Sequence, residues 1–111
     1  MILGEMLKDK YNLLYAEDGI KALEMIDENI DDIAAVLLDM VMPVMDGVEV
    51  LRRIREDNKT KHLPMLGLSV AADLENDLLR AGINQFIAKP YDNKDLIIAK
   101  IENVIRFSED T

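Results

Sequence analysis

The stretch VLLDMVMPVMDG, residues 36–47, decides the fold class and points to the site. A short apolar run leads directly into Asp39, as in a buried strand of a parallel sheet. An aspartate at the C-terminal end of such a strand lies at the open edge of the sheet, where it can act as a nucleophile or a metal ligand. Taken alone, Asp39 could equally cap the loop or the next helix, since aspartate is common at both places.

Four short apolar segments alternate with amphipathic segments along the chain. The predicted strands are residues 12–16, 34–38, 65–69 and 85–88, and apolar residues recur at helical spacing between them. This alternation predicts an α/β fold, a doubly wound parallel sheet with helices on both faces and right-handed crossovers. The order has one anomaly, because residues 1–8 are predicted to form a helix and no strand precedes them.

The composition excludes several classes of function. The 111 residues suffice for one domain, and 50% hydrophobic residues can fill its core. A net charge of −9 disfavours binding to nucleic acid or to an anionic membrane. The chain contains no cysteine, which excludes disulfides and suits the cytoplasm, and no apolar run is long enough for a membrane span. We therefore expect a cytoplasmic domain that binds neither nucleic acid nor membrane.

Two further polar residues follow the last two predicted strands. Ser69 ends one of them, and Lys89 comes directly after the other. A carboxylate, a hydroxyl and an ammonium group at one sheet edge suit phosphoryl transfer: the carboxylate attacks phosphorus, the ammonium offsets charge and the hydroxyl donates a hydrogen bond. Each residue alone is more often a turn residue or a solvated charge, but together they favour a common site.

With these residues, the chain resembles the receiver domain of two-component response regulators over nearly all of its length. The resemblance implies a flavodoxin-like fold and a signalling role without enzymatic activity. By this resemblance Asp39 is the phosphorylated residue, Ser69 the switch hydroxyl, Lys89 the phosphate-contacting lysine, and Phe86 the aromatic residue whose rotamer reports the state. It also implies a cis peptide bond before Pro90.

The chain departs from this family at its start. Receiver domains begin with a central strand that ends in two acidic residues, and these acids hold Mg²⁺ together with the phosphoacceptor. Here that strand is absent, so residues 1–111 are expected to form an N-terminally truncated receiver domain with four strands. Asp39 and the backbone carbonyl of Val41 would leave the Mg²⁺ site incomplete. We therefore expect this chain to bind Mg²⁺ weakly. We also expect a sensor histidine kinase or a small phosphodonor to phosphorylate its Asp39 slowly or not at all.

Two arrangements could repair the sheet. Residues 12–16 could pair with residues 34–38, which would bring Glu17 and Asp18 near Asp39 as substitute metal ligands. Alternatively, two chains could exchange or share strands as a homodimer. The homodimer is preferred, because residues 11–15 are less apolar than a central strand should be.

Two other functions stay open at this point. A receiver-like domain that no longer takes phosphate would be a binding or dimerisation module, which the missing acids favour. Val70 favours it too, because the family has a smaller residue after the switch hydroxyl. An enzyme with an aspartyl-phosphate intermediate would need a second aspartate where Val41 stands, which counts against it.

Overall fold

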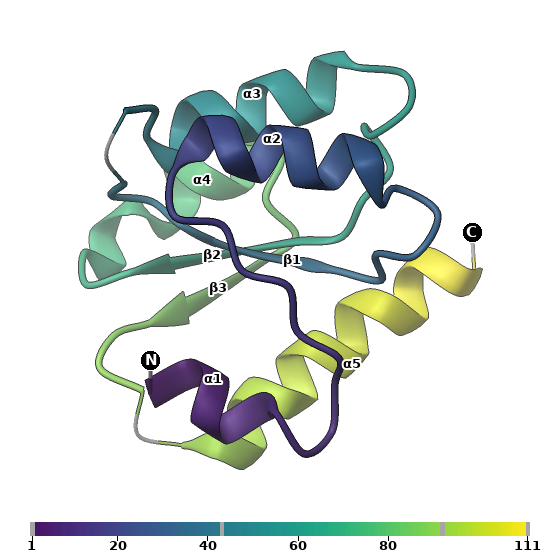
Figure 1. Ribbon diagram of the computed structural model, residues 1–111. Helices are drawn as coiled ribbons and strands as arrows, with labels where there is room; N and C mark the ends of the chain where they lie inside the picture. The colour runs from purple at the N-terminus through teal and green to yellow at the C-terminus, as the bar shows by residue number, and fades with distance from the viewer. Residues whose placement is uncertain (1, 43, 92, 111) are drawn as a thin grey trace.

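The computed structural model describes residues 2–42, 44–91 and 93–110 (Figure 1). Its elements, in chain order, are α1 (Ile2–Leu7), α2 (Gly19–Glu28), β1 (Val36–Asp39), α3 (Gly47–Glu56), β2 (Met65–Ser69), the 3₁₀ helix η1 (Ala72–Leu74), α4 (Glu75–Ala81), β3 (Gln85–Ala88) and α5 (Lys94–Asp110).

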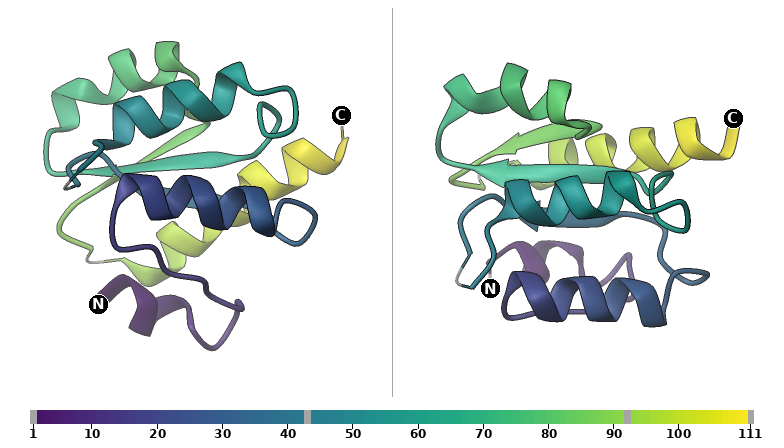
Figure 2. Two further views of the ribbon diagram at one scale, coloured as in Figure 1. Left: turned by 45° about the horizontal axis from the view of Figure 1, so that its top comes forward. Right: turned by 90° about the horizontal axis from the view of Figure 1, so that it is seen from above.

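A parallel sheet with the strand order β1-β2-β3 forms the centre of the molecule. Helices α2, α3 and α4 lie side by side on one face, and α1 and α5 cover the other (Figures 1 and 2). Each face has its own cluster of buried apolar side chains, one with Ile26 and Leu51 and one with Leu7 and Ile101. Burial on both faces explains why the strands are almost continuously apolar. The predicted α/β fold, a parallel sheet with helices on both faces, is confirmed.

The predicted number of strands is wrong by one. Residues 65–69 and 85–88 form strands as predicted, and the strand predicted at 34–38 forms at Val36–Asp39. Residues 12–16 form no strand and instead link α1 to α2 as an irregular segment (Figure 1). A cavity separates this segment from β1, so no neighbouring strand supplies the hydrogen bonds that a strand needs. The first of the two suggested repairs, pairing of residues 12–16 with the strand at 34–38, is therefore wrong.

Tyr11, in the segment that follows α1, forms a hydrogen bond with helix α5. Its hydroxyl donates a hydrogen bond to Glu102 Oε1 at 2.6 Å, and Lys10 Nζ lies 3.4 Å from the same oxygen. Burial, together with this hydrogen bond, raises the pKa of Tyr11. The hydrogen bond from Tyr11 is also the main cause that lowers the pKa of Glu102. The pair thus holds the N-terminal part of the chain against the face covered by α5.

Replacing Tyr11 with phenylalanine should lower the free energy of unfolding by about 1 kcal/mol at pH 8, the usual contribution of one hydrogen bond. In the folded state the pKa of Tyr11 is raised above its ordinary value of 10.0. The protonated phenol therefore contributes its full stabilisation of the folded state at pH values below 10.0. Its contribution is lost as the pH rises through the folded-state pKa. Urea unfolding at pH 8 and pH 11 should therefore show a smaller difference between variant and parent at the higher pH. Tyr15→Phe, at a largely exposed ring, serves as the control.

Val44 adopts a backbone conformation that disfavours its side chain. Its φ is +70°, in the left-handed region, where a β-branched residue is strained. Val44→Asn should raise the free energy of unfolding by roughly 1 kcal/mol, because asparagine tolerates this region. Val70→Asn is the matched control, since Val70 is 76% exposed and Val44 75% exposed. Urea unfolding that shows equal effects at both positions would contradict the strain at Val44.

Candidate functional site

The C-terminal ends of the three strands meet at one edge of the sheet and bring the predicted residues together. The register pairs Asp39 with Leu68, and Ser69 with Ala88. Lys89 N donates to the backbone oxygen of Ser69 at 2.9 Å, which fixes the start of the loop after β3. The sheet register thus places a carboxylate and a hydroxyl at the ends of two neighbouring strands, and an ammonium group directly after the third.

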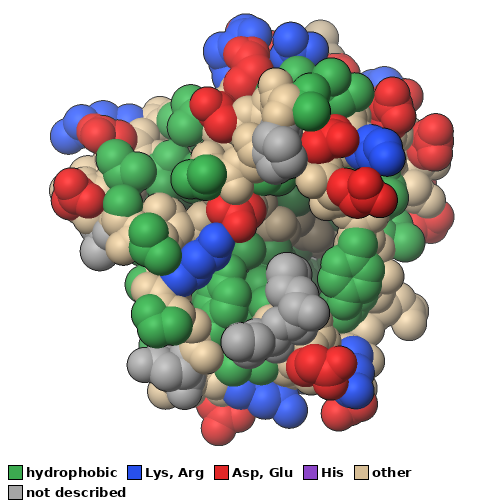
Figure 3. All heavy atoms as spheres, turned by 60° about the vertical axis from the view of Figure 1, so that its left-hand side comes forward, with side chains coloured by type: hydrophobic (Ala, Val, Ile, Leu, Met, Phe, Trp, Pro, Cys, Tyr) green, Lys and Arg blue, Asp and Glu red, His purple; other side chains and the backbone are tan. Residues whose placement is uncertain are grey.

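Asp39 and Lys89 form an ion pair at this edge. Lys89 Nζ donates to Asp39 Oδ2 at 2.6 Å, and Val41 N donates to Asp39 Oδ1 at 3.0 Å. The side chains are partly shielded, with 37% of Asp39 and 27% of Lys89 exposed. Figure 3 looks onto this edge and shows a hollow beside an acidic and a basic side chain, with hydrophobic side chains around it. A small molecule or a partner's side chain could therefore approach the carboxylate from solvent.

Ser69 and Phe86, the two predicted switch residues, are both buried. Ser69 is 5% exposed, and its Oγ accepts a hydrogen bond from Ala71 N at 3.0 Å. A hydroxyl that accepts in this way keeps its own proton free to donate. Phe86 is 4% exposed and packs in the core beneath α3 and α4. The predicted cis peptide bond between Lys89 and Pro90 is confirmed.

The candidate ligands for Mg²⁺ do not form a complete set. Asp39 lies at the sheet edge, but Lys89 already binds one of its oxygens. Asp18 Oδ1 caps α2 by accepting from Lys21 N at 2.9 Å, and Glu17 Oε2 lies 3.6 Å from Lys21 Nζ. Within the described ranges, no three or more His, Cys, Asp or Glu side chains are grouped to hold a metal ion. This donor set is short of the near-octahedral oxygen shell that Mg²⁺ requires.

Two residues at the site were missed by the sequence reasoning. A Cβ at Gly47 would lie 2.5 Å from the backbone oxygen of Asp39 and 2.7 Å from Met40 Cα, so glycine allows α3 to begin directly against β1. A glycine directly after the helix-capping Asp46 is the signal that could have revealed this contact. Tyr91 lines the same cavity as Asp39, and burial followed by the charge of Asp39 raises its pKa. The Tyr91 phenol therefore stays protonated near the carboxylate.

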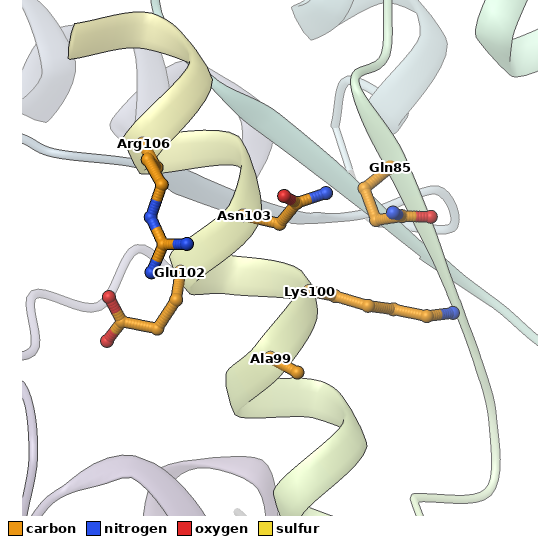
Figure 4. Close-up of a pocket in the computed structure, with 6 residues that line it drawn as sticks. All are labelled: Gln85, Ala99, Lys100, Glu102, Asn103 and Arg106. Carbon is orange, nitrogen blue, oxygen red and sulfur yellow. The ribbon is translucent and has the colours of Figure 1, made fainter. Parts of the chain in front are cut away.

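A second cavity of about 450 Å³ lies against α5 and the start of β3. Figure 4 shows its six lining residues, with the Lys100 side chain extended from α5 toward β3. Lys100 Nζ donates to the backbone oxygen of Phe86 at 2.8 Å. None of the residues that line this cavity belongs to the Asp39 site, and Lys100 there acts as a link between the helix and the strand.

No helix in the part of the chain that the structure describes is long and apolar enough to cross a membrane.

Comparisons with known proteins agree with this geometry. The family model described as "Response regulator receiver domain" matches residues 1–101. The chain is 32% identical over 107 residues to histidine kinase P4 of Formosa agariphila, covering 95% of this chain and 8% of that protein. It is 38% identical over 94 residues to chemotaxis protein CheY-3 of Vibrio cholerae, covering 81% of this chain and 71% of that protein. The chain thus spans a small part of the kinase and most of CheY-3.

A solved structure of a relative gives the same result for the fold. The receiver domain of sensor histidine kinase PA1611 from Pseudomonas aeruginosa, with magnesium coordinated in its active-site cleft, superimposes with a TM-score of 0.82 at 25% identity. The match covers 95% of this chain and 86% of that one. On the strength of the family match, the relatives and the sheet-edge geometry, the chain belongs to the response regulator receiver domain family of two-component signalling.

Proposed function

We propose that Asp39 accepts a phosphoryl group from a sensor histidine kinase or a small phosphodonor, and that the acylphosphate changes the surface around Ser69 and Phe86. The observation that carries this proposal is the 2.6 Å contact between Lys89 Nζ and Asp39 Oδ2, with Ser69 at the end of the next strand. The kinship with a histidine kinase and with CheY-3 supports the same role.

In this reaction an oxygen of Asp39 attacks phosphorus and forms a new P–O bond. The bond from phosphorus to the donor breaks, and the donor leaves with that electron pair. Lys89 offsets the negative charge on the phosphoryl oxygens from its position beside Asp39. The Ser69 hydroxyl, which keeps a free proton, can then turn from Ala71 N toward a phosphoryl oxygen. That rearrangement would transmit the modification to the neighbouring loop.

We infer further that this chain binds Mg²⁺ weakly. Among the described residues that end β1, β2 and β3, Asp39 is the one carboxylate, and Glu17 and Asp18 already have partners in the α2 region. The Val41 backbone carbonyl would add one neutral ligand. Phosphorylation is accordingly expected to be slow. We also propose that residues 1–111 act as one receiver unit in the cytoplasm, in keeping with the absence of cysteine.

Intact-mass spectrometry tests this function. The chain is incubated with Mg²⁺ and acetyl phosphate, a small phosphodonor, and the mass is followed with time. We expect a slowly forming adduct of one phosphoryl group, and slower formation when EDTA removes Mg²⁺. Absence of any adduct at long times and high Mg²⁺ would contradict the proposal and favour a binding module that does not take phosphate.

The second candidate function is a binding or dimerisation module that uses the open edge of β1. The observation that favours it is that, within the described residues, β1 pairs with β2 alone and leaves its other edge without a strand. Unpaired strand edges promote association with other chains. Sedimentation velocity over a range of concentrations tests whether two copies associate, and a monomer at every concentration would contradict the homodimer.

A further inference from the structure

The strand β3 lies at one edge of the sheet. Among the described strands β2 is its only neighbour, so the outer side of β3 has no strand to pair with. Lys89 N donates to the backbone oxygen of Ser69 at 2.9 Å, which turns the backbone of residue 89 toward β2. Because the direction alternates along a strand, the N–H and C=O groups of Phe86 and Ala88 point away from β2. These groups form the outer edge of β3.

Two side chains bind the outward backbone groups of Phe86. Gln85 Oε1 accepts a hydrogen bond from Phe86 N at 3.1 Å, and Lys100 Nζ donates one to Phe86 O at 2.8 Å. The Lys100 side chain reaches this oxygen from α5 (Figure 4). A hydrogen bond from a charged donor is stronger than one from a neutral donor. We call Gln85 and Lys100 the edge guard, because together they occupy both outward groups of Phe86.

The edge guard stands where an added strand would have to lie. A neighbouring strand runs about 4.7–4.9 Å from its partner. Lys100 Nζ, at 2.8 Å from Phe86 O, lies inside that distance. Both guard residues also line the cavity of about 450 Å³ beside the start of β3. The space next to this edge is therefore crossed by a side chain, and an added strand must displace it.

The guard leaves too little of the edge free for pairing. The strand β3 has four residues, Gln85–Ala88, and only Phe86 and Ala88 present their backbone groups outward. With Phe86 occupied, Ala88 alone remains. Strands in folded proteins are usually at least about three residues long, so a single free residue cannot hold an added strand.

The sequence of β3 explains why its edge needs such protection. Phe86 and Ile87 are 4% and 2% exposed, and aromatic and β-branched residues favour strands. An open edge on an apolar strand promotes pairing between copies of a chain. Lysine at an edge opposes this pairing, because a second copy would bring a second ammonium group to the same place.

We propose that Gln85 and Lys100 keep the outer edge of β3 closed to strand addition, and that copies of this chain associate through β3 once the guard is removed. The guard acts on the backbone of Phe86, so it does not depend on phosphorylation of Asp39. Two copies can pair here only after both side chains have released Phe86.

Sedimentation velocity of the double variant Gln85→Val/Lys100→Met tests the proposal. Methionine keeps a long flexible side chain but has no N–H donor, and valine removes the acceptor and suits a strand. We expect its sedimentation coefficient to rise with protein concentration more steeply than that of the parent. Lys100→Arg keeps the charge and the donor and should behave as the parent does. Lys94→Met, which removes the same charge from an exposed position on α5, is the matched control.

Amide hydrogen exchange shows which edge is involved. At low concentration Gln85→Val should speed exchange of the Phe86 amide by about two- to tenfold, the effect of one hydrogen bond. In the associated double variant, exchange at Phe86 and Ala88 should slow as the concentration rises. If circular dichroism shows that the double variant is unfolded, each single variant is measured, and a smaller change in the same direction is expected.

Three results would overturn the proposal. They are sedimentation of the folded variants that matches the parent, an equal change in Lys94→Met, and protection that grows at Leu37 on β1 rather than at Phe86. None of these measurements uses a phosphodonor, so the outcome is independent of the proposed phosphorylation of Asp39.

Discussion

Replacing Asp39 with alanine should abolish the phosphoryl adduct formed with acetyl phosphate and Mg²⁺. Asp39 is the carboxylate that the ends of β1, β2 and β3 bring together with Lys89 and Ser69, so its removal takes away the attacking oxygen. When the nucleophile that forms the covalent bond is lost, the reaction is abolished rather than slowed. Intact-mass spectrometry measures the result, and Asp31→Ala, at an exposed carboxylate away from the sheet edge, should keep the adduct.

Asp39→Asn distinguishes the loss of chemistry from the loss of structure. The carboxylate accepts from Val41 N on one oxygen and from Lys89 Nζ on the other, and the single amide oxygen of asparagine can keep one of these two hydrogen bonds in a side chain of nearly the same shape. An amide is not a nucleophile for phosphorus, so this variant should stay folded by circular dichroism and still fail to gain a phosphoryl group. A full adduct in the folded asparagine variant would show that another residue accepts the phosphoryl group.

Arg55 should be the surface arginine whose loss costs the most stability. The Arg55 side chain extends from α3, and its guanidinium donates hydrogen bonds to the backbone oxygens of Gly82 at 2.8 Å, Lys61 at 2.8 Å and Leu63 at 2.7 Å. It also donates to Asn84 Oδ1 at 2.9 Å, and that oxygen accepts from Met65 N at 2.7 Å. One side chain thus joins α3 to the loop before β2 and to the loop before β3.

Arg55→Ala should lower the free energy of unfolding by about 2–4 kcal/mol, because it removes several charge-assisted hydrogen bonds and leaves partly buried carbonyls without a donor. Arg53→Ala is the matched control. Arg53 lies on the same helix, is 53% exposed and reaches Glu49 at 3.4 Å, so its loss should change stability by less than about 0.5 kcal/mol. Urea denaturation of both variants measures the difference, and equal effects would contradict the linking role of Arg55.

The sequence allowed correct prediction of the features that depend on local pattern. The apolar runs before Ser69 and Lys89 have the length and the boundaries of buried strands, and both strands form where they were predicted. Because the ends of parallel strands share one edge, the meeting of Asp39 with Lys89 also followed from the order of elements. The roles of Ser69 and Phe86 as switch residues stay predictions.

The features that were missed depend on contacts between distant parts of the chain. Residues 12–16 have a pattern compatible with a strand, but a strand also needs a neighbour, and a cavity separates them from β1. The links made by Arg55 reach residues 6 to 29 positions away, which no local pattern encodes. The positive φ of Val44 could not be foreseen either, because valine is among the residues least suited to it.

The position of the phosphoryl group is the most direct test of the phosphoacceptor role. After incubation with acetyl phosphate and Mg²⁺, reduction with borohydride converts an aspartyl phosphate to homoserine, which peptide mass spectrometry can locate in the sequence. The structure predicts homoserine at position 39, because Asp39 is the carboxylate paired with Lys89 at the sheet edge. Homoserine at another aspartate, or none in a chain shown to be folded, would contradict the assignment.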